Sequence, residues 1–334
     1  MKVLFVSGGG IGDILMTSPM FRAIKQAYPS SNVSVLIVQS INSSLLINNP
    51  FVDQIIDWNK FKGNSWGLIS RLRSEKFDYA IHNHSCPRWK FYVVPFLAAI
   101  PNRLGFDRTS TGKGWKTRAQ KVMLTNHVPY KTKSELRAQM NLDILKLIKV
   151  FNDDFSYDLH LPQAEIKVEN RIGIHPGSDG RGAIKRWPVQ SFMEMAREMV
   201  SEHGKSVQFF LGPAEQELKS VIVEEKGIEI VEAKSIADLV LQMSSCRMFV
   251  SNDSGLSHIA AALKLPTVVL FGPTSPEEYI VPTLHVNVTV EGYNCTNCFR
   301  TKTCEKSPPT CMKSISVDKV VNAMLELQSE GVIA

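Results

Sequence analysis

Short apolar runs alternate along the chain with segments that are apolar at every third or fourth position. The runs lie at 2–7, 33–38, 54–58, 79–83, 171–176, 207–212, 228–233, 248–253 and 267–272. Between them, stretches such as 16–28 and 189–204 have the period of amphipathic helices. Nearly continuous apolar strands that alternate with helices predict parallel sheets covered on both faces.

The alternation forms two series. A helical pattern over 134–150 and a polar break over 152–169 separate them, so we place a domain boundary near residue 160. The prediction is an α/β protein with two Rossmann-like domains, 1–160 and 161–334. The second includes a terminal helix that could pack back on the first. Ligands of such folds bind beyond the carboxyl ends of the strands, which makes the cleft between the domains the expected active site.

The first strand is followed by SGGGIGDILMTSP, residues 7–19. A dinucleotide fingerprint would need a further glycine where Asp13 stands and an acid after the second strand, which instead ends in VLIVQS. The loop itself contains no Gly-Lys-Ser or Gly-Lys-Thr, so a P-loop at this position is excluded. We interpret Gly10 and Gly12 as positions where a substrate approaches the backbone closely. Asp13, taken alone, is more typical of an acid that complements a helix dipole.

Three polar stretches follow strands of the second series, at 175–188, 211–217 and 251–263. The sequence Asp253-Ser254-Gly255 opens a helix, whose first N–H groups and positive dipole end suit an anion. Lys185 could add a point charge to the same phosphate. Taken singly, Lys185 is more typical of a surface lysine, and His258 is equally typical of a hydrogen-bonded core histidine.

The order and spacing of these stretches resemble glycosyltransferase family 9, the heptosyltransferases of lipopolysaccharide core assembly. The resemblance covers nearly the whole chain and rests on GGGIGDILMTSP, KRWP, GPAEQE and NDSGLSHIAAAL followed by PTVVLFGPT. It implies a GT-B fold in which the C-terminal domain holds a nucleotide-sugar donor. It also implies an inverting transfer of heptose from ADP-heptose to a lipopolysaccharide-core or related anionic acceptor.

The resemblance assigns roles to individual residues. Asp13 matches the catalytic base, Lys185 the lysine that contacts the donor diphosphate, and Glu215, or alternatively Glu217, the acid that binds the ribose. The other expected substrate-binding residues are Gly10, Gly12, Ser178, Asp253, Ser254, Gly255, Leu256 and His258. No D-x-D pair occurs in the sequence, so we expect no catalytic metal, with a lysine and a helix dipole meeting the diphosphate charge instead.

Charge is distributed unevenly. The chain has a net charge of +6, but residues 88–137 alone hold eleven lysines and arginines against two acids. Such a segment is typical either of a solvated surface loop or of a surface for an anionic partner. We expect the partner to be a glycolipid or polysaccharide acceptor, with a protein acceptor also open. No apolar run suits a signal peptide or a membrane span. The protein is therefore expected in the cytoplasm, in peripheral contact with the inner membrane and without nucleic acid.

Four cysteines, Cys295, Cys298, Cys304 and Cys311, are spaced C-x2-C-x5-C-x6-C. This spacing suits a structural zinc or iron ion, although four thiols without a metal remain an alternative. Two other functions stay open at this point. A nucleotide-sugar epimerase would share the fold but leave the basic segment without a large anionic acceptor. A non-catalytic, metal-containing module that binds lipid or nucleic acid would leave KRWP and DSGLSH unexplained.

Overall fold

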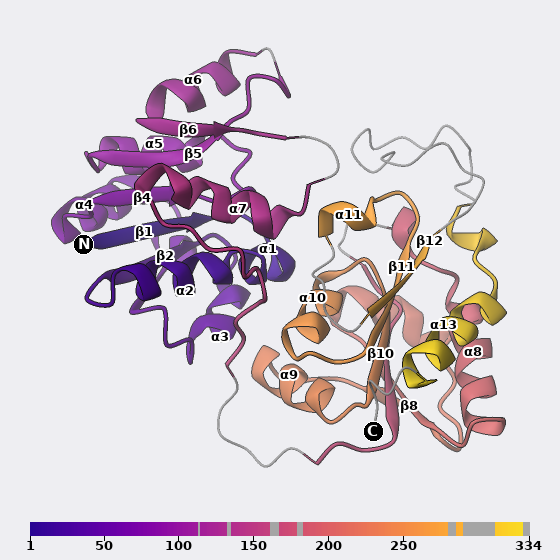
Figure 1. Ribbon diagram of the computed structural model, residues 1–334. Coiled ribbons are helices and arrows are strands. Elements are labelled where there is room, and N and C mark those ends of the chain that lie inside the picture. The colour runs from indigo at the N-terminus through magenta and orange to yellow at the C-terminus, as the bar shows by residue number, and fades with distance from the viewer. Residues whose placement is uncertain are drawn as a thin grey trace. The chain divides into compact units, whose positions relative to one another are not determined.

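The computed structural model describes residues 1–112, 114–131, 135–160, 167–178, 183–279, 285–289 and 311–329. These residues form two compact units (Figure 1). The first comprises Met1–His160 together with Glu277, Glu278 and Tyr279, and the second comprises the remaining described residues. Each unit has its own sheet and its own hydrophobic core.

The first unit is built on a six-stranded parallel sheet in the order β3-β2-β1-β4-β5-β6. Its strands are β1 (Lys2–Ser7), β2 (Asn32–Ile37), β3 (Gln54–Asp57), β4 (Tyr79–His82), β5 (Asn102–Asp107) and β6 (Asn126–Pro129). Its helices are α1 (Ile11–Leu15), α2 (Ser18–Ala27), α3 (Ser43–Leu46), α4 (Ser65–Glu75), α5 (Lys90–Leu97), α6 (Trp115–Met123) and α7 (Arg137–Leu145). Short 3₁₀ helices are η1 (Ser40–Asn42), η2 (Trp58–Phe61) and η3 (Lys146–Ile148).

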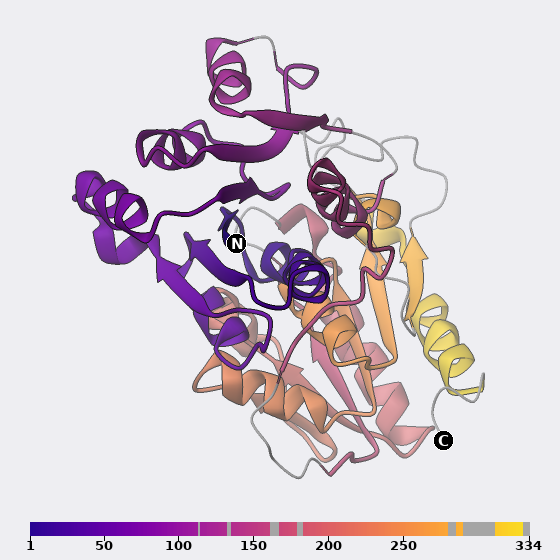
Figure 2. The ribbon, with the colours of Figure 1, turned by 60° about the vertical axis from the view of Figure 1, so that its left-hand side comes forward.

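The centre of this sheet is fully buried, as its apolar pattern predicts. Residues Val3–Val6 of β1 have no exposed surface, and the Phe5 ring packs edge-on against Phe21 of α2 with centroids 4.9 Å apart. Helices α2 and α7 lie side by side (Figures 1 and 2). The chain then runs back along α2, where Arg22 forms ion pairs with Asp154 and Asp158. The segment before residue 160 is thus fixed to the first unit.

The second unit repeats this topology, with strand order β12-β11-β10-β7-β8-β9. Its strands are β7 (Arg171–His175), β8 (Ser206–Phe210), β9 (Ile228–Val231), β10 (Met248–Asn252), β11 (Thr267–Phe271) and β12 (His285–Thr289). Its helices are α8 (Val189–Ser201), α9 (Ile236–Ser244), α10 (Gly255–Ala262) and α13 (Val317–Ser329), and α11 (Pro276–Tyr279) leads into the residues that group with the first unit. Its 3₁₀ helices are η4 (Ala183–Lys185), η5 (Pro213–Ser220) and η6 (Met312–Ser314).

Two Rossmann-like parallel sheets were predicted, and both are present. At the centre of each sheet, two strands that are not consecutive in the sequence pair with each other: β1 with β4, and β7 with β10. The strand order reverses at this point, and the carboxyl ends of the two strands there form the usual ligand site of this fold. The residues that follow β1, β4, β7 and β10 therefore lie where ligands bind in such folds.

The terminal helix α13 packs against α8, β11 and β12 of the second unit (Figure 1). Its expected contact with the N-terminal domain stays a prediction. Val320, Met324 and Leu327 of α13 are buried and belong to the core of that unit. These side chains recur at helical spacing, so the apolar face of α13 is used within the second unit.

Candidate functional site

Asp13 lies in the first turn of α1, directly after the glycine loop that follows β1. Its Oδ2 atom accepts a hydrogen bond from the backbone N–H of Gly10 at 2.9 Å. The side chain remains 31% exposed. The local fold thus anchors one carboxylate oxygen at the carboxyl end of β1 and leaves the group accessible.

The glycines before Asp13 are required first by the protein's own packing. A Cβ atom at Gly9 would lie 1.8 Å from Asp13 Oδ2, and one at Gly8 would lie 2.7 Å from the Phe91 ring. At Gly10 a Cβ atom would be 3.7 Å from Gln39, an ordinary contact. The first two glycines therefore make room for the carboxylate and for α5. Close substrate approach at Gly10 and Gly12 stays a prediction.

A histidine that the sequence analysis did not single out contacts Asp13. His84 follows β4, is 7% exposed, and places Nε2 at 2.9 Å from Asp13 Oδ1. The signal was available, because the polar residues Asn83 and His84 directly follow the strand YAIH. What the sequence does not reveal is that β4 pairs directly with β1, which brings His84 beside Asp13.

Two other ionisable groups near Asp13 stay neutral. Burial raises the pKa of the Cys86 thiol to about 12, and the Asp13 charge acts in the same direction. Burial, followed by the same charge, raises the pKa of Tyr157 well above its usual value. Neither group competes with Asp13 for a proton near neutral pH.

In the second unit, two separately predicted residues form a buried ion pair. Lys185 Nζ lies 2.8 Å from Asp253 Oδ2, which also accepts a hydrogen bond from Thr274 Oγ1 at 2.7 Å. Burial would raise the pKa of the Asp253 carboxyl, but the charge and hydrogen bond of Lys185, with Thr274, hold it below its usual value. Lys185 is 8% exposed, so the surface-lysine interpretation is wrong.

Asn252 fixes the loop that carries Lys185. Its Nδ2 group donates to the carbonyl of Pro176 at 2.8 Å, and its Oδ1 accepts the backbone N–H of Trp187 at 2.9 Å. Asn252 is the last residue of β10, which pairs with β7. This buried amide therefore ties Pro176, directly after β7, and Trp187 of the KRWP sequence to the strand that leads into α10.

Helix α10 begins beside the ion pair. Ser254 is its N-cap in extended backbone conformation, and Gly255 and Leu256 form its first turn. Ser254 Oγ is buried and has no hydrogen-bond partner among the described residues. His258, one turn further, is 7% exposed. The hydroxyl and the first N–H groups of α10 offer donors next to Lys185.

The two candidate ribose-binding acids have different environments. Glu215 is 5% exposed, and its Oε2 accepts the backbone N–H of Gly212 at 3.1 Å. A Cβ atom at Gly177 would lie 2.4 Å from Glu215 Oε1, so that glycine leaves room for the carboxylate. Glu217 has a side chain 68% exposed that pairs with Arg186 at 2.7 Å. Glu215 is thus held in one position.

Arg186, which pairs with Glu217, also contacts Ser178. It donates from Nε to Ser178 Oγ at 3.3 Å, and Ser178 is 4% exposed. Burial lowers the pKa of His175, whose Nδ1 donates to the carbonyl of Phe210 at 2.9 Å. Arg186 also lies 3.9 Å from Glu215 Oε1, so it links Ser178 with that carboxylate.

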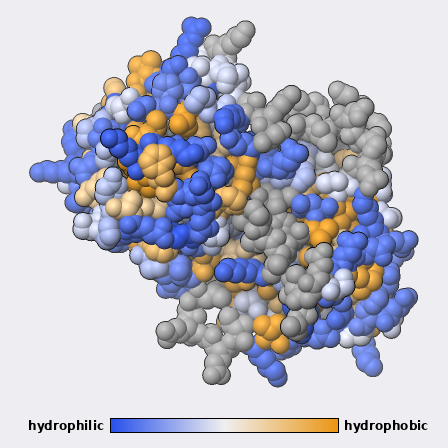
Figure 3. Space-filling view, viewed as in Figure 1, coloured by the Kyte–Doolittle hydropathy of each residue, from blue (hydrophilic) through white to orange (hydrophobic). Residues whose placement is uncertain are grey.

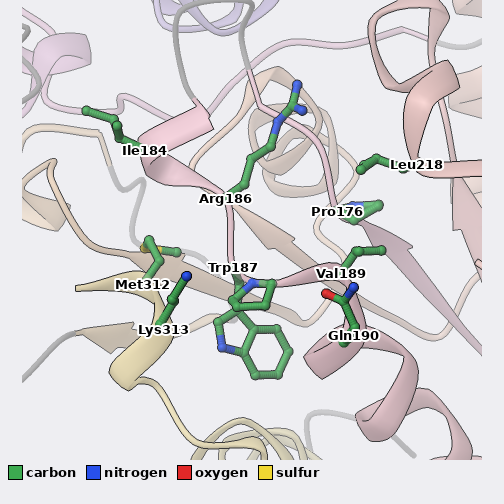
Figure 4. Close-up of a pocket in the computed structure, with 10 residues that line it drawn as sticks. Pro176, Ile184, Arg186, Trp187, Val189, Gln190, Leu218, Met312 and Lys313 are labelled. Atoms are coloured by element: carbon green, nitrogen blue, oxygen red, sulfur yellow. The ribbon is translucent and has the colours of Figure 1, made fainter. Parts of the chain in front are cut away.

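A pocket of about 430 Å³ lies beside the KRWP loop (Figure 4). Figure 4 shows Arg186 and the Trp187 indole pointing in opposite directions from consecutive positions. The indole is buried and donates from Nε1 to the carbonyl of Ile315 at 3.0 Å. The lining residues are Pro176, Ile184, Arg186, Trp187, Pro188, Val189, Gln190, Leu218, Met312 and Lys313. The pocket is mostly apolar and does not include Lys185 or Asp253.

The basic segment is not a uniform positive surface. Arg108 and Arg137 are buried, the first over the Tyr130 ring at 3.8 Å and the second paired with Glu278. Lys121 and Lys131 pair with the segment's two acids, Asp107 and Glu135. The arginines have an internal role, which a count of charges along the sequence cannot reveal.

A smaller set of exposed residues remains. We call it the α5–α6 surface, and it consists of Arg88, Trp89, Lys90, Trp115, Lys116 and Arg118. Trp115 is 66% exposed, and its ring lies 6.1 Å from that of Trp89. Figure 3 shows apolar and hydrophilic residues mixed over this part of the first unit. Large exposed aromatic rings beside basic side chains are typical of contact surfaces for anionic partners.

The predicted cysteine site lies mostly outside the described residues, since only Cys311 falls within them. Cys311 is buried, with Sγ 3.3 Å from where a Cβ atom at Gly272 would lie. Elsewhere, Glu198, Glu202 and His203 at the end of α8 hold ligand atoms within 4.8 Å of one another. Side chains on a partly exposed helix end often meet in this way without an ion. Within the ranges that the structure covers, no helix has the length and apolar content of a membrane span.

Comparisons with known proteins agree with this arrangement. The family model described as Glycosyltransferase family 9 (heptosyltransferase) matches residues 65–308. Lipopolysaccharide heptosyltransferase 2 of Escherichia coli (strain K12) is 26% identical over 83% of this chain and 84% of its own length. Lipooligosaccharide heptosyltransferase 2 of Campylobacter jejuni is 26% identical over 98% of this chain and 100% of its own length.

Solved structures are also similar. E. coli ADP-heptose lps heptosyltransferase II has a TM-score of 0.77 and 21% identity, covering 99% of this chain and 100% of that one. E. coli heptosyltransferase WaaC with ADP-2-deoxy-2-fluoro heptose has a TM-score of 0.74 and 17% identity, covering 98% and 99% of the two chains. These likenesses confirm the predicted GT-B fold.

Proposed function

The chain belongs to glycosyltransferase family 9, and from that membership we propose that it transfers heptose from ADP-heptose to an anionic acceptor of the lipopolysaccharide-core type, with inversion. The single observation that carries this proposal is the Lys185–Asp253 ion pair beside the start of α10. Two residues chosen separately from the sequence meet there, at the strand ends where a nucleotide sugar binds in this fold. The names of the relatives support heptose as the sugar, and the WaaC structure supports the ADP moiety.

On this proposal, the second unit binds the donor. Lys185 meets the diphosphate, assisted by Ser254 and the N–H groups of Gly255 and Leu256. Asp253 holds Lys185 in place, and His258 lies one turn along the same helix. Glu215 accepts hydrogen bonds from the ribose, because it is the fixed one of the two candidate acids. Ser178, which follows β7, is proposed to approach the donor phosphates.

The first unit binds the acceptor, with Asp13 as general base. The acceptor hydroxyl loses its proton to Asp13 as its oxygen forms a bond to the anomeric carbon, and the bond from that carbon to the diphosphate breaks. The sugar passes through an oxocarbenium-like state. A positioned base contributes about 10²–10⁴-fold to such a step. The departing ADP gains negative charge, which Lys185 and the dipole of α10 stabilise. These two groups take the place of a bridging metal ion.

The donor is tested by thermal shift. ADP-heptose at about 100 times its Kd should stabilise the protein by about 2.7 kcal/mol, because a ligand bound only to the native state adds its binding free energy to folding. UDP-sugars and GDP-sugars at equal concentration should shift the melting temperature far less. Stabilisation by a UDP-sugar, with an epimerised sugar as product, would instead favour the nucleotide-sugar epimerase.

The acceptor is proposed to lie at the inner face of the cytoplasmic membrane, and the α5–α6 surface is the part of the chain that suits this contact. Lys116 and Arg118 of α6 are exposed, and Trp115 next to them suits the headgroup region of a bilayer. Each basic residue near an anionic surface adds about 1 kcal/mol.

Replacing Lys116 and Arg118 by glutamine should therefore weaken binding to anionic vesicles about 30-fold, the equivalent of about 2 kcal/mol. Sedimentation with vesicles of phosphatidylethanolamine and phosphatidylglycerol measures this. The matched control, Lys226→Gln with Lys234→Gln, removes two exposed charges from the second unit and should leave vesicle binding unchanged. Equal binding by both double variants would rule out a role for this surface in membrane contact.

A structural zinc or iron ion at Cys295, Cys298, Cys304 and Cys311 also remains part of the proposal. It rests on the C-x2-C-x5-C-x6-C spacing. Elemental analysis of the purified protein is the direct measurement. The ion would order its own loop and take no part in the transfer.

A further inference from the structure

A buried polar chain lies behind Asp13. His84 and Asn141 are 7% and 0% exposed, and Asn141 comes from α7, far along the sequence. Asn141 Oδ1 accepts the backbone N–H of His84 at 2.9 Å and lies 3.2 Å from its ring Nδ1. Buried polar side chains cost free energy unless they are satisfied. These two buried side chains lead to the proposed catalytic carboxylate of Asp13, which indicates a functional role for them.

The contacts fix where the imidazole carries its hydrogen. Asn141 Nδ2 donates to the carbonyl of Met16 at 3.0 Å, so the amide oxygen must face His84. An amide oxygen only accepts, which means that Nδ1 of His84 is protonated. Its other nitrogen, Nε2, is left facing Asp13 Oδ1 at 2.9 Å.

This short contact is attractive only when the imidazole carries a positive charge. A bare Nε2 lone pair and a carboxylate oxygen would repel at 2.9 Å. The contact is an ion pair without aligned hydrogen-bond geometry, and Nε2 has no hydrogen-bond partner among the described residues. An imidazolium beside a carboxylate makes this contact an attraction between opposite charges.

The carboxylate is then held from two sides. Gly10 N–H anchors Oδ2, and His84 faces Oδ1. The helix that carries Asp13 is fixed as well, because Thr17 Oγ1 donates to the Asp13 carbonyl at 2.7 Å and receives a hydrogen bond from Asn83 Nδ2 at 2.7 Å. The consecutive residues Asn83 and His84 thus contact Thr17, just beyond α1, and Asp13, within it.

We propose that His84 is a positioning residue for Asp13: protonated at Nε2, it keeps the carboxylate ionised and oriented towards the acceptor hydroxyl, while Asn141 fixes the imidazole. This inference rests on the proposed function, since it assumes that Asp13 is the base. During transfer the acceptor proton moves to Asp13, and His84 keeps its own proton throughout. The group acts by orientation and charge and exchanges nothing with the substrate.

The test is His84→Gln, which keeps an amide N–H near the position of Nε2 but no charge. The value of kcat should fall about 10-fold, with the donor KM unchanged, because the loss lies in the chemical step. In an Asp13→Asn background the same replacement should cause no further loss, since the carboxylate that it positions is gone. A purely structural role would lower kcat by the same factor in both backgrounds. The control His203→Gln, a histidine beside Glu198 and Glu202 at the end of α8, should turn over like the wild type.

A spectroscopic measurement on the wild-type protein needs no folded variant at this position. ¹⁵N NMR of labelled histidine should show one ring protonated at both nitrogens under assay conditions, and that signal should change in Asp13→Asn. A wild-type His84 without a proton on Nε2 would overturn the proposal. The failures are separable: full activity of Asp13→Asn removes the base itself, whereas an inactive Asp13→Asn with a fully active His84→Gln removes only the positioning role.

Discussion

Replacing Asp13 by asparagine is expected to lower kcat by at least ~10²-fold while leaving the melting temperature and the donor affinity nearly unchanged. Asparagine keeps the size of the side chain, and its Oδ1 can still accept the Gly10 N–H. Its NH₂ group would face His84 Nε2, which accepts a hydrogen bond once it has lost its proton. The fold therefore has partners for the new amide, but the amide cannot take a proton from the acceptor.

The competing explanation makes the opposite forecast. If Asp13 only complements the dipole of α1, its replacement should cost about 0.3–1 kcal/mol of stability and little activity. A destabilised but active Asp13→Asn enzyme would end the catalytic assignment. Melting curves and turnover, measured on the same preparation, distinguish the two.

The first unit offers a matched control for this experiment. Asp53 is 35% exposed, accepts the backbone N–H of Val33 at 2.6 Å, and pairs with Lys25 at 2.7 Å. It therefore has the same kind of anchoring as Asp13, at a position outside the proposed site. Asp53→Asn should lose some stability and keep its turnover, so a loss of activity common to both variants would point to folding rather than chemistry.

The sequence predicted the two sheets because their central strands are buried on both faces and read as apolar runs. It did not predict β5, β6 and β12. The sequences of β5 and β6, NRLGFD and NHVP, carry charged or polar residues at their ends, and β6 and β12 are edge strands with fewer buried positions. An edge strand is stabilised by pairing with a neighbour, which a local pattern does not record.

The sequence predicted individual residues of the site but not which of them contact one another. Lys185 and Asp253 were each selected from a strand end, yet their ion pair depends on β7 lying beside β10. His84 was missed for the same reason, because it meets Asp13 through the pairing of β4 with β1. Charge shows this most clearly, because Arg108 and Arg137 were counted among the charges of a basic surface but are buried. The type of a residue indicates its chemistry, whereas its contacts depend on how the strands pair.

Replacing Lys185 by alanine is expected to weaken donor binding at least ~10²-fold, close to 3 kcal/mol. A charged hydrogen bond contributes about 1.5–3 kcal/mol, and the variant also leaves the Asp253 carboxylate next to the donor phosphates. Folding should suffer too, because breaking a buried ion pair typically costs about 3–5 kcal/mol. Isothermal titration with ADP-heptose and thermal melts measure the two losses separately.

The pair also has a predicted pH dependence. The pKa of Asp253 is lowered in the folded protein, so the pair contributes stability that is present above the unfolded value of about 3.9 and lost as the pH falls through the folded value. In Lys185→Ala the carboxyl keeps its burial and loses its cation. The variant should therefore lose most stability near neutral pH and differ least from the wild type in acid.

A combined variant separates the role of Lys185 in folding from its role in binding. Lys185→Met with Asp253→Leu and Thr274→Val removes the cation, the carboxylate that it contacts at 2.8 Å and the hydroxyl that donates to that carboxylate. Apolar replacement of a whole buried pair is often neutral or stabilising, so the melting temperature should return towards that of the wild type. Donor affinity should stay as weak as in Lys185→Ala, because the diphosphate still lacks its cation. If the combined variant instead bound ADP-heptose with wild-type affinity, Lys185 would serve only the fold, and the diphosphate charge would have to be met by α10 alone.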